Sequence, residues 1–430
     1  MKLCVVGAGH VGLVSGACFA ELGHRVVCVD NDVRRIAALK RGTMPFFEPD
    51  METLVRRHVR RKALSFTTDL REGVRHGEVI FIAVGTPPKA NGEADLTAVE
   101  HVCRDIAKAM TSYRLIVEKS TVPVETGKWL RRTIAQNLKR SVPFDVASNP
   151  EFLREGTAVR DFLHPDQIVL GVESPEARKR LLEVYRLVKA PLVVTDIASA
   201  ELIKHASNSF LAMKISFINA VAQICDRVSA DVERVAEGMG LDPRIGKAFL
   251  DAGVGFGGFC FPKDIEAFVA IAEKLGVEFR LLKEVARINA QQRELLIKKI
   301  EDRVWNLKHK TIGVWGLSFK PNTDDMRFAP AIDVIHRLTA AGAVVRAYDP
   351  QAMQEAKQCL NGATLCRTMY DAAAGSDCLV LLTEWPQFQQ ADWRRVKRVM
   401  AHPVVVDGRN CLDPAILRKQ GFEYAGIGRG

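Results

Sequence analysis

The motif Gly-Ala-Gly-His-Val-Gly at residues 7–12 places the strongest limit on how this chain can fold. An apolar run over residues 2–6 precedes it, and helix-compatible sequence follows from about His10 to Leu22. In such a setting the first glycine permits a tight turn, the second a close approach of a pyrophosphate, and the third the packing of helix on strand. The motif therefore predicts one strand–helix unit of a doubly wound α/β sheet that binds a dinucleotide.

An acidic residue follows at the expected distance. The second apolar run, Arg25–Asp30, ends in a carboxylate that can accept hydrogen bonds from a ribose 2′-hydroxyl and would repel a 2′-phosphate. This favours NAD over NADP. Arg34 and Arg35 come next and fit either a contact with a 2′-phosphate or plain surface charge, so NADP stays open as the alternative.

Alternation of apolar runs with helix-compatible stretches continues to about residue 195 and predicts a parallel, doubly wound sheet. The further runs are Val79–Val84, Leu115–Lys119, Phe144–Ala147, Ile168–Gly171 and Leu192–Thr195.

From Ala200 the apolar residues recur at steps of three and four, which predicts a long helix. One stripe comprises Leu202, Ala206, Phe210, Met213, Phe217, Val221, Ile224 and Val228, and a second comprises Leu211, Ile215 and Ile218. A helix that is apolar on two faces is usually enclosed between two bodies, so we expect a spine that connects domains.

Helical sequence resumes near Asp264–Leu275 and Leu281–Trp305, and strand alternation restarts at Thr311–Trp315 without a glycine motif. The predicted fold is α/β, with two Rossmann-like doubly wound domains joined by a long central helix. The expected domains are residues 1–197, 198–305 and 306–430.

Composition excludes several classes of protein. With 47% hydrophobic and 26% charged residues among 430, the chain resembles a soluble globular protein, and no apolar run is long enough to span a membrane. The net charge of +10 includes a basic cluster at 56–62. Such a cluster fits either nucleic-acid binding or a solvated helix face. We favour the solvated face, because no aromatic residues that could stack on bases accompany the cluster.

Ten cysteines occur without a CxxC pair or the spacing of a zinc site, so we expect reduced thiols and no metal. The N-terminus runs directly into a strand rather than a signal peptide, which predicts a cytoplasmic protein.

Cys260 lies in the segment Gly-Gly-Phe-Cys-Phe-Pro-Lys-Asp at 257–264. Glycines before it would let a ligand approach the backbone, and a helix beginning near Pro262 would lower the pKa of the thiol. An ordinary loop cysteine fits the residues equally well. With the dinucleotide motif, however, a reactive thiol suggests an oxidation through a thiohemiacetal and a thioester, converting an alcohol to a carboxylate with two NAD consumed.

Six segments together carry a resemblance to the UDP-glucose/GDP-mannose dehydrogenase family of nucleotide-sugar dehydrogenases, in its UDP-glucose branch. They are NPEFLREG at 149–156, ELIKHASN at 201–208, FLDAG at 249–253, GGFCFPKD at 257–264, GLSFK at 316–320 and DGR at 407–409.

The resemblance implies an N-terminal NAD domain, a central helical dimerisation region and a C-terminal nucleotide-sugar domain. It implies oxidation of UDP-glucose to UDP-glucuronate, a precursor for polysaccharides, by a cytoplasmic homodimer joined through the central helix. GDP-mannose and UDP-N-acetylmannosamine remain alternative substrates. A two-electron alcohol dehydrogenase and an inactive NAD or nucleotide-sugar sensor remain alternative functions.

Catalytic roles also follow from the resemblance. Cys260 would be the nucleophile, Glu151 a base for thioester hydrolysis, and Asp264 a group that orients a water or takes a proton. Thr121 would lie beside the nicotinamide and a catalytic water. The base of the first oxidation stays open.

Lys204 and Asn208 are four residues apart, so a helix places them on one face. The resemblance implies that they polarise or stabilise the oxygen at the reacting carbon. Without it, Lys204 reads as a lysine snorkelling at a helix edge and Asn208 as a satisfied core amide.

Binding contacts are implied for two ligands. For NAD the residues are Gly7, Gly9, Val11, Gly12, Asp30, Arg35, Thr86, Thr121, Glu155, Lys263 and Arg327. For the nucleotide-sugar they are Glu151, Phe152, Leu153, Arg154, Glu155, Lys204, Asn208, Arg244, Phe249, Leu250, Asp251, Ala252, Gly253, Gly257, Lys320 and Arg409. Arg244 would reach across the dimer interface, and Lys320 and Arg409 would meet phosphates or sugar.

The chain departs from the family pattern at three positions. Phe259 stands where a small hydroxyl residue is usual, Ala220 where a glutamate is common, and His10 where a tyrosine is frequent. None of these removes a predicted catalytic group, but Phe259 leaves the exact sugar preference open.

Overall fold

The structure is a computed structural model that describes residues 1–429. Its internal contacts divide the chain into two compact units. The first comprises Met1–Ser207 with Glu266–Val277, and the second comprises Asn208–Ile265 with the chain from Glu278 onward. The predicted three-part division is therefore neither supported nor excluded by this compactness and stays a prediction.

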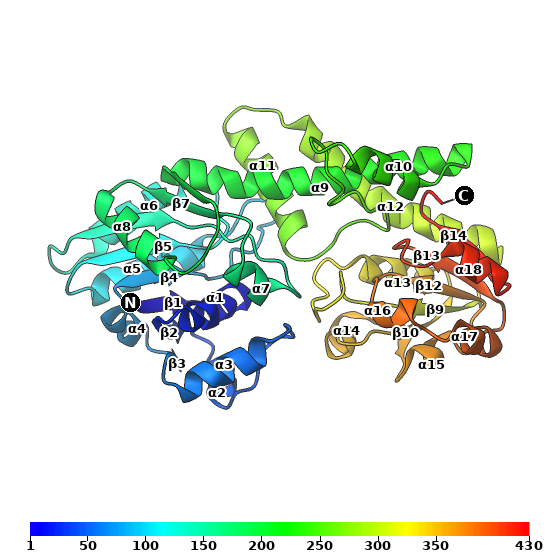
Figure 1. Ribbon diagram of the computed structural model, residues 1–430, viewed down its shortest axis with the longest axis horizontal. Helices are drawn as coiled ribbons and strands as arrows, with labels where there is room; N and C mark the ends of the chain where they lie inside the picture. Colours follow the sequence, from blue (N-terminus) through cyan, green and yellow to red (C-terminus); the bar gives the residue numbers. More distant parts are fainter. Residues whose placement is uncertain (430) are drawn as a thin grey trace. The chain divides into compact units, whose positions relative to one another are not determined.

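Within residues 1–429 the first unit holds an eight-stranded sheet of order β3-β2-β1-β4-β5-β6-β7-β8 (Figure 1). The strands are β1 (Lys2–Val6), β2 (Arg25–Val29), β3 (Leu64–Thr67), β4 (Val79–Ile82), β5 (Arg114–Glu118), β6 (Phe144–Ser148), β7 (Ile168–Val172) and β8 (Leu192–Thr195). The helices are α1 (His10–Glu21), α2 (Val33–Lys40), α3 (Met51–Arg60), α4 (Leu70–His76), α5 (Thr97–Ala109), α6 (Thr126–Asn137), α7 (Ala158–Leu163) and α8 (Pro175–Val184).

Helices cover both faces of this sheet, which explains why its strands are apolar on both sides. One core packs the sheet against α1, α2, α3, α7 and α8, and another packs it against α4, α5 and α6. Buried parallel strands read as continuous apolar runs rather than as alternating ones. The predicted doubly wound α/β layer is confirmed.

One strand pair of this sheet departs from the predicted parallel arrangement. β7 runs antiparallel to β6, through the pairs Ala147↔Val172 and Ser148↔Gly171. A parallel neighbour requires a crossover that places a helix over the sheet. Here the connecting segment contains only the short α7, which packs against α1, so the chain returns in the opposite direction.

The long helix α9 (Ile197–Val228) begins in the first unit and ends in the second. Residues of its predicted main stripe, including Phe210, Phe217 and Ile224, are more than half exposed. Of the second stripe, Ile218 is fully buried. The helix is therefore enclosed on one face only, and a row of large apolar side chains remains on the surface of the single chain.

The second unit begins with helices and ends in a parallel sheet of order β11-β10-β9-β12-β13-β14 within residues 1–429. The strands are β9 (Thr311–Trp315), β10 (Val344–Tyr348), β11 (Ala363–Leu365), β12 (Cys378–Leu381), β13 (Val404–Asp407) and β14 (Glu423–Gly426). The helices are α10 (Val232–Gly240), α11 (Cys260–Lys274), which continues into the first unit, α12 (Arg280–Val304), α13 (Pro330–Ala340), α14 (Met353–Cys359), α15 (Met369–Ala373), α16 (Pro386–Gln389), α17 (Trp393–Val399) and α18 (Pro414–Lys419).

This sheet also has helices on both faces, with the fully buried Trp315 at the end of its central strand β9. The chain reverses its winding between β9 and β12. In doubly wound sheets, ligands bind at the carboxyl ends of the strands beside such a reversal. The loops after β9, β12 and β13 are therefore the place to look for a ligand site in this unit.

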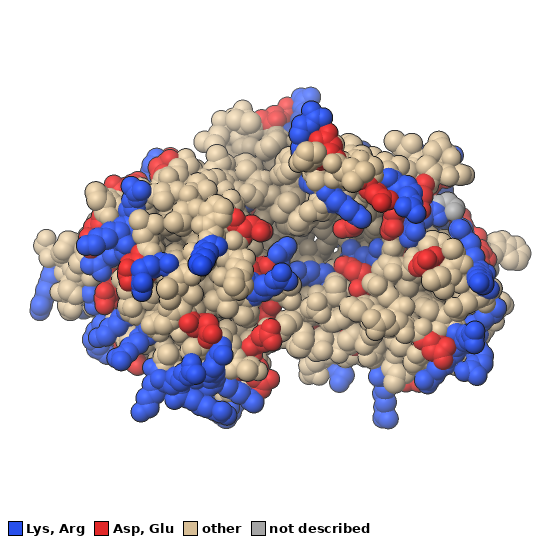
Figure 2. Space-filling model, viewed as in Figure 1, with Lys and Arg blue, Asp and Glu red and all other residues tan. Residues whose placement is uncertain are grey.

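Two expectations from composition concern the surface. Arg56, Arg57, Arg60 and Arg61 are exposed on or just after α3, as a solvated helix face requires. Figure 2 shows Lys and Arg side chains gathered over the α2–α3 region. Among residues 1–429 the structure contains no helix with both the length and the apolar character to cross a membrane.

Candidate active site

The glycine motif of the first unit forms a cradle after β1. A Cβ on Gly7 would lie 2.5 Å from the carbonyl oxygen of Ala83, and one on Gly12 would lie 1.8 Å from that of Gly7. Gly9 differs, since a Cβ there would point into open space at the start of α1. A pyrophosphate fits such an open helix N-terminus, where backbone N–H groups and the helix dipole favour an anion.

Asp30 follows β2 and faces this cradle. Its Oδ2 accepts hydrogen bonds from Ala8 N at 2.7 Å and from Arg35 Nη1 at 2.9 Å, and its Oδ1 accepts one from Asp32 N at 2.9 Å. A carboxylate offers about four lone-pair positions, so acceptor capacity remains for a ribose hydroxyl. Because Arg35 pairs with Asp30, it is not simply a charge on the surface.

Asp349 occupies the matching position after β10 in the second unit. Its Oδ2 accepts from Leu317 N at 2.7 Å, from Ser318 N and Oγ at 3.1 Å, and from Trp385 Nε1 at 3.1 Å. Its Oδ1 accepts from two further backbone N–H groups, and the residue is fully buried. No acceptor capacity is left for a ribose, so Asp349 cannot hold a ribose in the way that Asp30 is predicted to.

Lys204 and Glu151 form a buried ion pair in the first unit. Lys204 Nζ lies 3.3 Å from Glu151 Oε1, and the two side chains are 5% and 6% exposed. Glu151 Oε2 also accepts a hydrogen bond from Leu153 N at 2.6 Å, and Lys204 lies over the ring of Phe152. The reading of Lys204 as a snorkelling edge lysine does not hold, because its ammonium is enclosed beside the loop that carries Glu151.

A second buried lysine supports that loop. Lys119 Nζ donates to the backbone oxygen of Asn149 at 3.3 Å, to its Oδ1 at 3.1 Å, and to Tyr185 Oη at 3.5 Å. Burial lowers the pKa of Lys119 to about 8, although the carboxylate of Glu151 acts in the opposite direction. Lys119 thus fixes the turn at Asn149 that places Glu151.

Two carboxyl groups meet where β5 ends beside α9. Burial raises the pKa of Glu118 well above its ordinary value, and the nearby carboxylate of Glu201 adds to the effect. Glu201 accepts hydrogen bonds from Glu125 N at 2.7 Å and Gly127 N at 2.8 Å at the start of α6. Burial raises the pKa of Glu201 as well. The two carboxyl groups therefore lie buried where β5, α9 and the start of α6 meet, and Glu201 holds the α6 terminus through its two backbone donors.

The segment after β5 brings further predicted residues together. Thr86 Oγ1 donates to the backbone oxygen of Thr121 at 2.9 Å. His205 Nε2 lies 2.7 Å from the backbone oxygen of Val122. The loop that carries Thr121 is therefore held between the end of β4 and the helix that carries Lys204.

His10, at the first position of α1, has a charged partner. Its Nε2 lies 3.3 Å from Glu48 Oε2, and Glu48 accepts hydrogen bonds from Gly156 N and Ala158 N. Burial acts to lower the pKa of His10, but Glu48 and the carboxylate of Glu155 outweigh it, so the pKa is raised. This contact joins the glycine motif to the loop after Glu151.

In the second unit a glycine-rich loop leads to Cys260, the first residue of α11. Asn289 holds the loop by accepting from Phe256 N at 2.8 Å and donating to Phe256 O at 3.1 Å. A Cβ on Gly255 would lie 2.5 Å from Asn289 Oδ1, and one on Gly257 would lie 2.4 Å from the carbonyl oxygen of Phe328. Side chains at these glycines would displace the backbone that presents the thiol.

Asp264 lies one turn after Cys260 and is 1% exposed. Asn208 Nδ2 donates to its Oδ2 at 2.6 Å, and Lys263 Nζ lies 2.7 Å from its Oδ1. The structure thus brings three predicted residues into one cluster and gives Asn208 a polar partner. The partner of Asn208 is therefore a buried carboxylate that is itself a predicted site residue.

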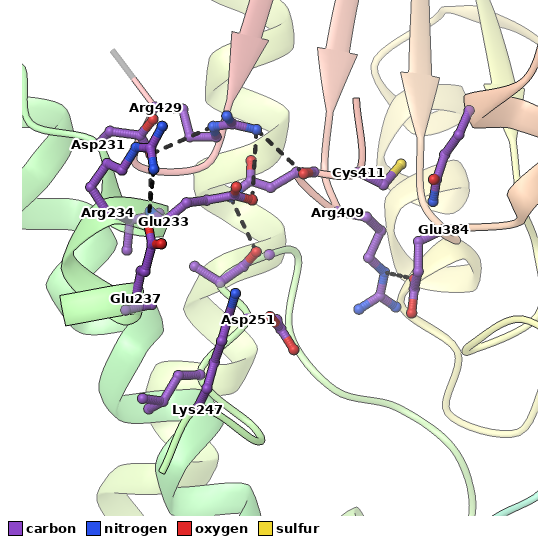
Figure 3. A pocket seen from close by; sticks show the side chains of 17 residues that line it. Asp231, Glu233, Arg234, Glu237, Lys247, Asp251, Glu384, Arg409, Cys411 and Arg429 are labelled. Atoms are coloured by element: carbon purple, nitrogen blue, oxygen red, sulfur yellow. Dashed lines mark hydrogen bonds and ion pairs between the residues drawn. The ribbon is translucent and has the colours of Figure 1, made fainter. Parts of the chain in front are cut away.

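A cavity of about 510 Å³ lies beside the same loop in the second unit (Figure 3). Predicted substrate residues line part of it: Leu250, Asp251, Ala252, Gly253 and Arg409. Figure 3 shows Arg409 beside Glu384 on one side and residues of α10 on the other. The Arg409 guanidinium donates to the carbonyls of Leu382, Gly255 and Phe319, which fixes it at the carboxyl ends of the strands.

Other predicted residues lie outside these clusters. Arg154 is turned toward Asp161, donating through Nε at 2.9 Å and Nη2 at 2.6 Å. Arg244 is largely exposed and pairs with Asp242 of its own turn. Lys320 lies over the ring of Phe319.

Sequence reasoning assigned no role to several residues that build the site: Lys119, Asn149, Glu118, Glu201 and Asn289. One signal was available, since Glu118 and Lys119 place two charges directly at the end of an apolar run. Charged residues in such a position are rarely buried unless they are paired. Asn289 carries no such signal, because its partner loop is more than thirty residues away.

Three family models match the chain in order. The NAD binding domain of the UDP-glucose/GDP-mannose dehydrogenase family matches residues 1–189, its central domain matches 198–291, and its UDP binding domain matches 313–414.

Full-length relatives agree with this. The chain is 46% identical over 436 residues to the UDP-glucose 6-dehydrogenase of Rhizobium meliloti (strain 1021), covering 100% of both. It is 45% identical over 429 residues to the UDP-glucose 6-dehydrogenase TuaD of Bacillus subtilis (strain 168), covering 100% of this chain and 93% of that one.

A solved structure of a UDP-glucose dehydrogenase from the hyperthermophilic archaeon Pyrobaculum islandicum is also similar. It has a TM-score of 0.94 at 39% identity, and covers 100% of this chain and 98% of that one. From its motifs, its NAD-binding cradle and these relatives, the chain belongs to the UDP-glucose/GDP-mannose dehydrogenase family and is an NAD-dependent enzyme.

Proposed function

We propose that this chain oxidises UDP-glucose to UDP-glucuronate in two steps on one cysteine. The observation that carries the proposal is the buried Asn208–Asp264–Lys263 cluster one helical turn from Cys260. The Rhizobium and Bacillus relatives and the Pyrobaculum structure all bear names of UDP-glucose dehydrogenases, which supports this sugar over the alternatives.

The chemistry balances as follows. The C6 alcohol loses a proton and a hydride to become an aldehyde, and NAD, when bound, accepts one hydride in each oxidation. The Cys260 thiolate adds to C6, forming a thiohemiacetal that loses the second hydride to become a thioester. Water then attacks C6, the C–S bond breaks, and the thiol is regenerated. The sum is UDP-glucose, two NAD and one water giving UDP-glucuronate, two NADH and three protons.

The proposed roles of the side chains follow from what surrounds them. Lys204 and Asn208 share one face of α9 and stabilise negative charge on the oxygen at C6. Glu151 acts as a base in hydrolysis, with Lys204 holding its carboxylate. Asp264, held between Asn208 and Lys263, orients the attacking water.

Binding residues are proposed on the same basis. The glycine cradle and Asp30 hold NAD, and Arg409 with the 249–253 loop holds the nucleotide-sugar. Lys263 and Arg327 are proposed as further NAD contacts, and Lys320 as a further contact of the nucleotide-sugar.

We propose a homodimer through α9. Phe210, Phe217 and Ile224 are spaced seven residues apart, so they lie along one face, and each is more than half exposed. A row of large exposed apolar side chains of this kind marks a protein interface. Arg244 is proposed to reach the partner's substrate. We also propose a cytoplasmic location, since a cysteine nucleophile has to stay reduced and thiols stay reduced in that compartment.

The test is the stoichiometry of NADH with a panel of UDP-glucose, GDP-mannose and UDP-N-acetylmannosamine. Two NADH per UDP-glucose, with acid as product, is expected. One NADH per substrate would identify a simple alcohol dehydrogenase, and binding without turnover would identify a sensor. Cys260→Ser should nearly abolish acid formation while NAD still binds, and Cys359→Ser, at the end of α14, serves as the matched control.

A further inference from the structure

Phe259, the residue before the proposed nucleophile, lies between two cations. The guanidinium carbon of Arg327 is 4.4 Å from the centroid of the Phe259 ring, and Lys263 Nζ is 5.6 Å from it. Both distances are within the range of about 6 Å in which a cation is attracted to the face of an aromatic ring. The ring is half-buried, so its attraction is less weakened by water than at an open surface.

Each cation is also held by its own carboxylate. Arg327 binds Asp325 through Nε at 2.9 Å and Nη2 at 2.6 Å, and Lys263 pairs with Asp264 at 2.7 Å. Every cation therefore has two anchors, a carboxylate and the shared ring. The carboxylate neutralises the positive charge of each cation, and the ring orients its long side chain.

The backbone fixes the ring against the Arg327 segment. Gly258 N donates to the carbonyl oxygen of Arg327 at 3.0 Å, and a Cβ on Gly257 would lie 2.4 Å from the carbonyl oxygen of Phe328. Ring and guanidinium are thus built on two segments that are hydrogen-bonded to each other, and their contact does not depend on a flexible surface loop.

We infer that Phe259 is a positioning residue for NAD, whose ring holds Arg327 and Lys263 in the orientation in which they bind the dinucleotide. The inference rests on the proposed roles of these two cations. Two positive charges that share one ring repel each other, and an anionic ligand such as a pyrophosphate relieves that repulsion. A small residue at this position would remove the ring contact that orients both long side chains.

The experiment measures NAD affinity by titration calorimetry on the full-length protein without nucleotide-sugar. Phe259→Leu keeps an apolar side chain but removes the ring, and should weaken NAD binding about fivefold, equivalent to ~1 kcal/mol. Phe259→Tyr keeps the ring and should bind NAD within a factor of about two of the original. Tyr370→Leu, which removes the ring under Arg395 elsewhere, is the matched control and should change nothing.

A double-mutant cycle distinguishes positioning from packing. Arg327→Gln should weaken NAD binding in the original chain and clearly less so in Phe259→Leu, because the ring acts through that guanidinium. Equal NAD affinity in the original chain and Phe259→Leu, or identical effects of Arg327→Gln in both backgrounds, would overturn the inference. If Phe259→Leu fails to fold, Phe259→Met takes its place in the cycle.

The outcome is separable from that of the proposed function. A chain that binds NAD but does not oxidise UDP-glucose contradicts the proposed function, whereas the effect of Phe259 on NAD affinity is measured without turnover. Alkylation of Cys260 by iodoacetamide gives a second readout. NAD should slow the alkylation, and Phe259→Leu should require about fivefold more NAD for the same protection.

Discussion

The ammonium of Lys204 lies 3.3 Å from Oε1 of Glu151, with both side chains almost fully enclosed. This relationship joins α9 to the loop after β6 and links two groups with proposed catalytic roles. Removing either partner of a buried pair leaves an uncompensated charge, which is more costly than the pair itself is favourable. A substitution of either residue should therefore change both the proposed catalytic step and the free energy of unfolding.

Replacing Lys204 by Met should lower kcat about 100-fold or more, because one oxyanion donor is lost, with a smaller change in the KM for UDP-glucose. Stability should fall by about 3 kcal/mol, since the Glu151 carboxylate remains buried. Steady-state kinetics and urea unfolding of the same preparation check both effects.

The second substitution Glu151→Gln in that background should recover most of the stability and none of the activity. Lys214→Met, on the same helix, is the control, since Lys214 binds only backbone oxygens of residues 245 and 246. A Lys204→Met enzyme with unchanged kcat would return this lysine to a purely structural role.

Lys119 should give the protein a distinctive pH dependence. Its pKa is lowered from 10.5 to about 8, so between these values the unfolded chain binds a proton that the folded chain does not. Stability therefore rises with pH across this window, and the cost of burying the lysine is complete below about pH 8. When unfolding is compared from pH 7.5 to 10, the stability of the original chain minus that of Lys119→Met should increase as pH rises. A constant difference would contradict the assignment.

Cofactor choice should depend on Asp30. The original enzyme should prefer NAD, measured as kcat/KM for NAD against NADP, because a carboxylate accepts from a 2′-hydroxyl and repels a 2′-phosphate. Asp30→Asn removes the repulsion and releases the Arg35 guanidinium, so the preference should shrink by about tenfold or more. Asp69→Asn, which alters the N-terminal cap of α4, is the control and should leave it unchanged. Equal use of both cofactors by the original enzyme would show that the arginines dominate the site.

The exposed row on α9 should hold a dimer together. Phe217→Glu places a charge in the middle of the row and should convert the dimer to a monomer in light scattering at micromolar concentration. Val33→Glu substitutes another apolar residue that is more than half exposed, away from α9, and should leave the dimer intact. A monomeric original chain would contradict the proposal directly.

The sequence predicted the principal strands because buried parallel strands are continuous apolar runs, and Lys2–Val6 and Leu192–Thr195 match β1 and β8 residue for residue. It missed β3, β11 and β14. Leu64–Thr67 alternates with an exposed serine, and Ala363–Leu365 is only three residues long. Strand direction at β7 was unpredictable because periodicity is the same for both orientations.

The sequence could place residues together where a motif fixes local geometry. The glycine motif and Asp30 lie together because strand and helix geometry places them there, and the fold also brings Asn208 to Asp264, while the catalytic roles of both stay predictions. The partners of buried charges were not predictable, since Lys119 finds Tyr185 and Glu201 finds the α6 terminus only through the tertiary fold. No periodicity encodes such distant pairs.

The hydrogen bonds that occupy every acceptor position of Asp349 bear on how the enzyme exchanges its cofactor. If two oxidations occur at one dinucleotide site, as proposed, that site must release NADH and bind a second NAD within each catalytic cycle. Under the proposed reaction, the sulfur–carbon bond to Cys260 keeps the half-oxidised sugar from diffusing away during the exchange. Because the acceptors of Asp349 are all used within the protein, the proposed bond to Cys260 must retain the sugar for as long as the exchange of NADH for NAD takes.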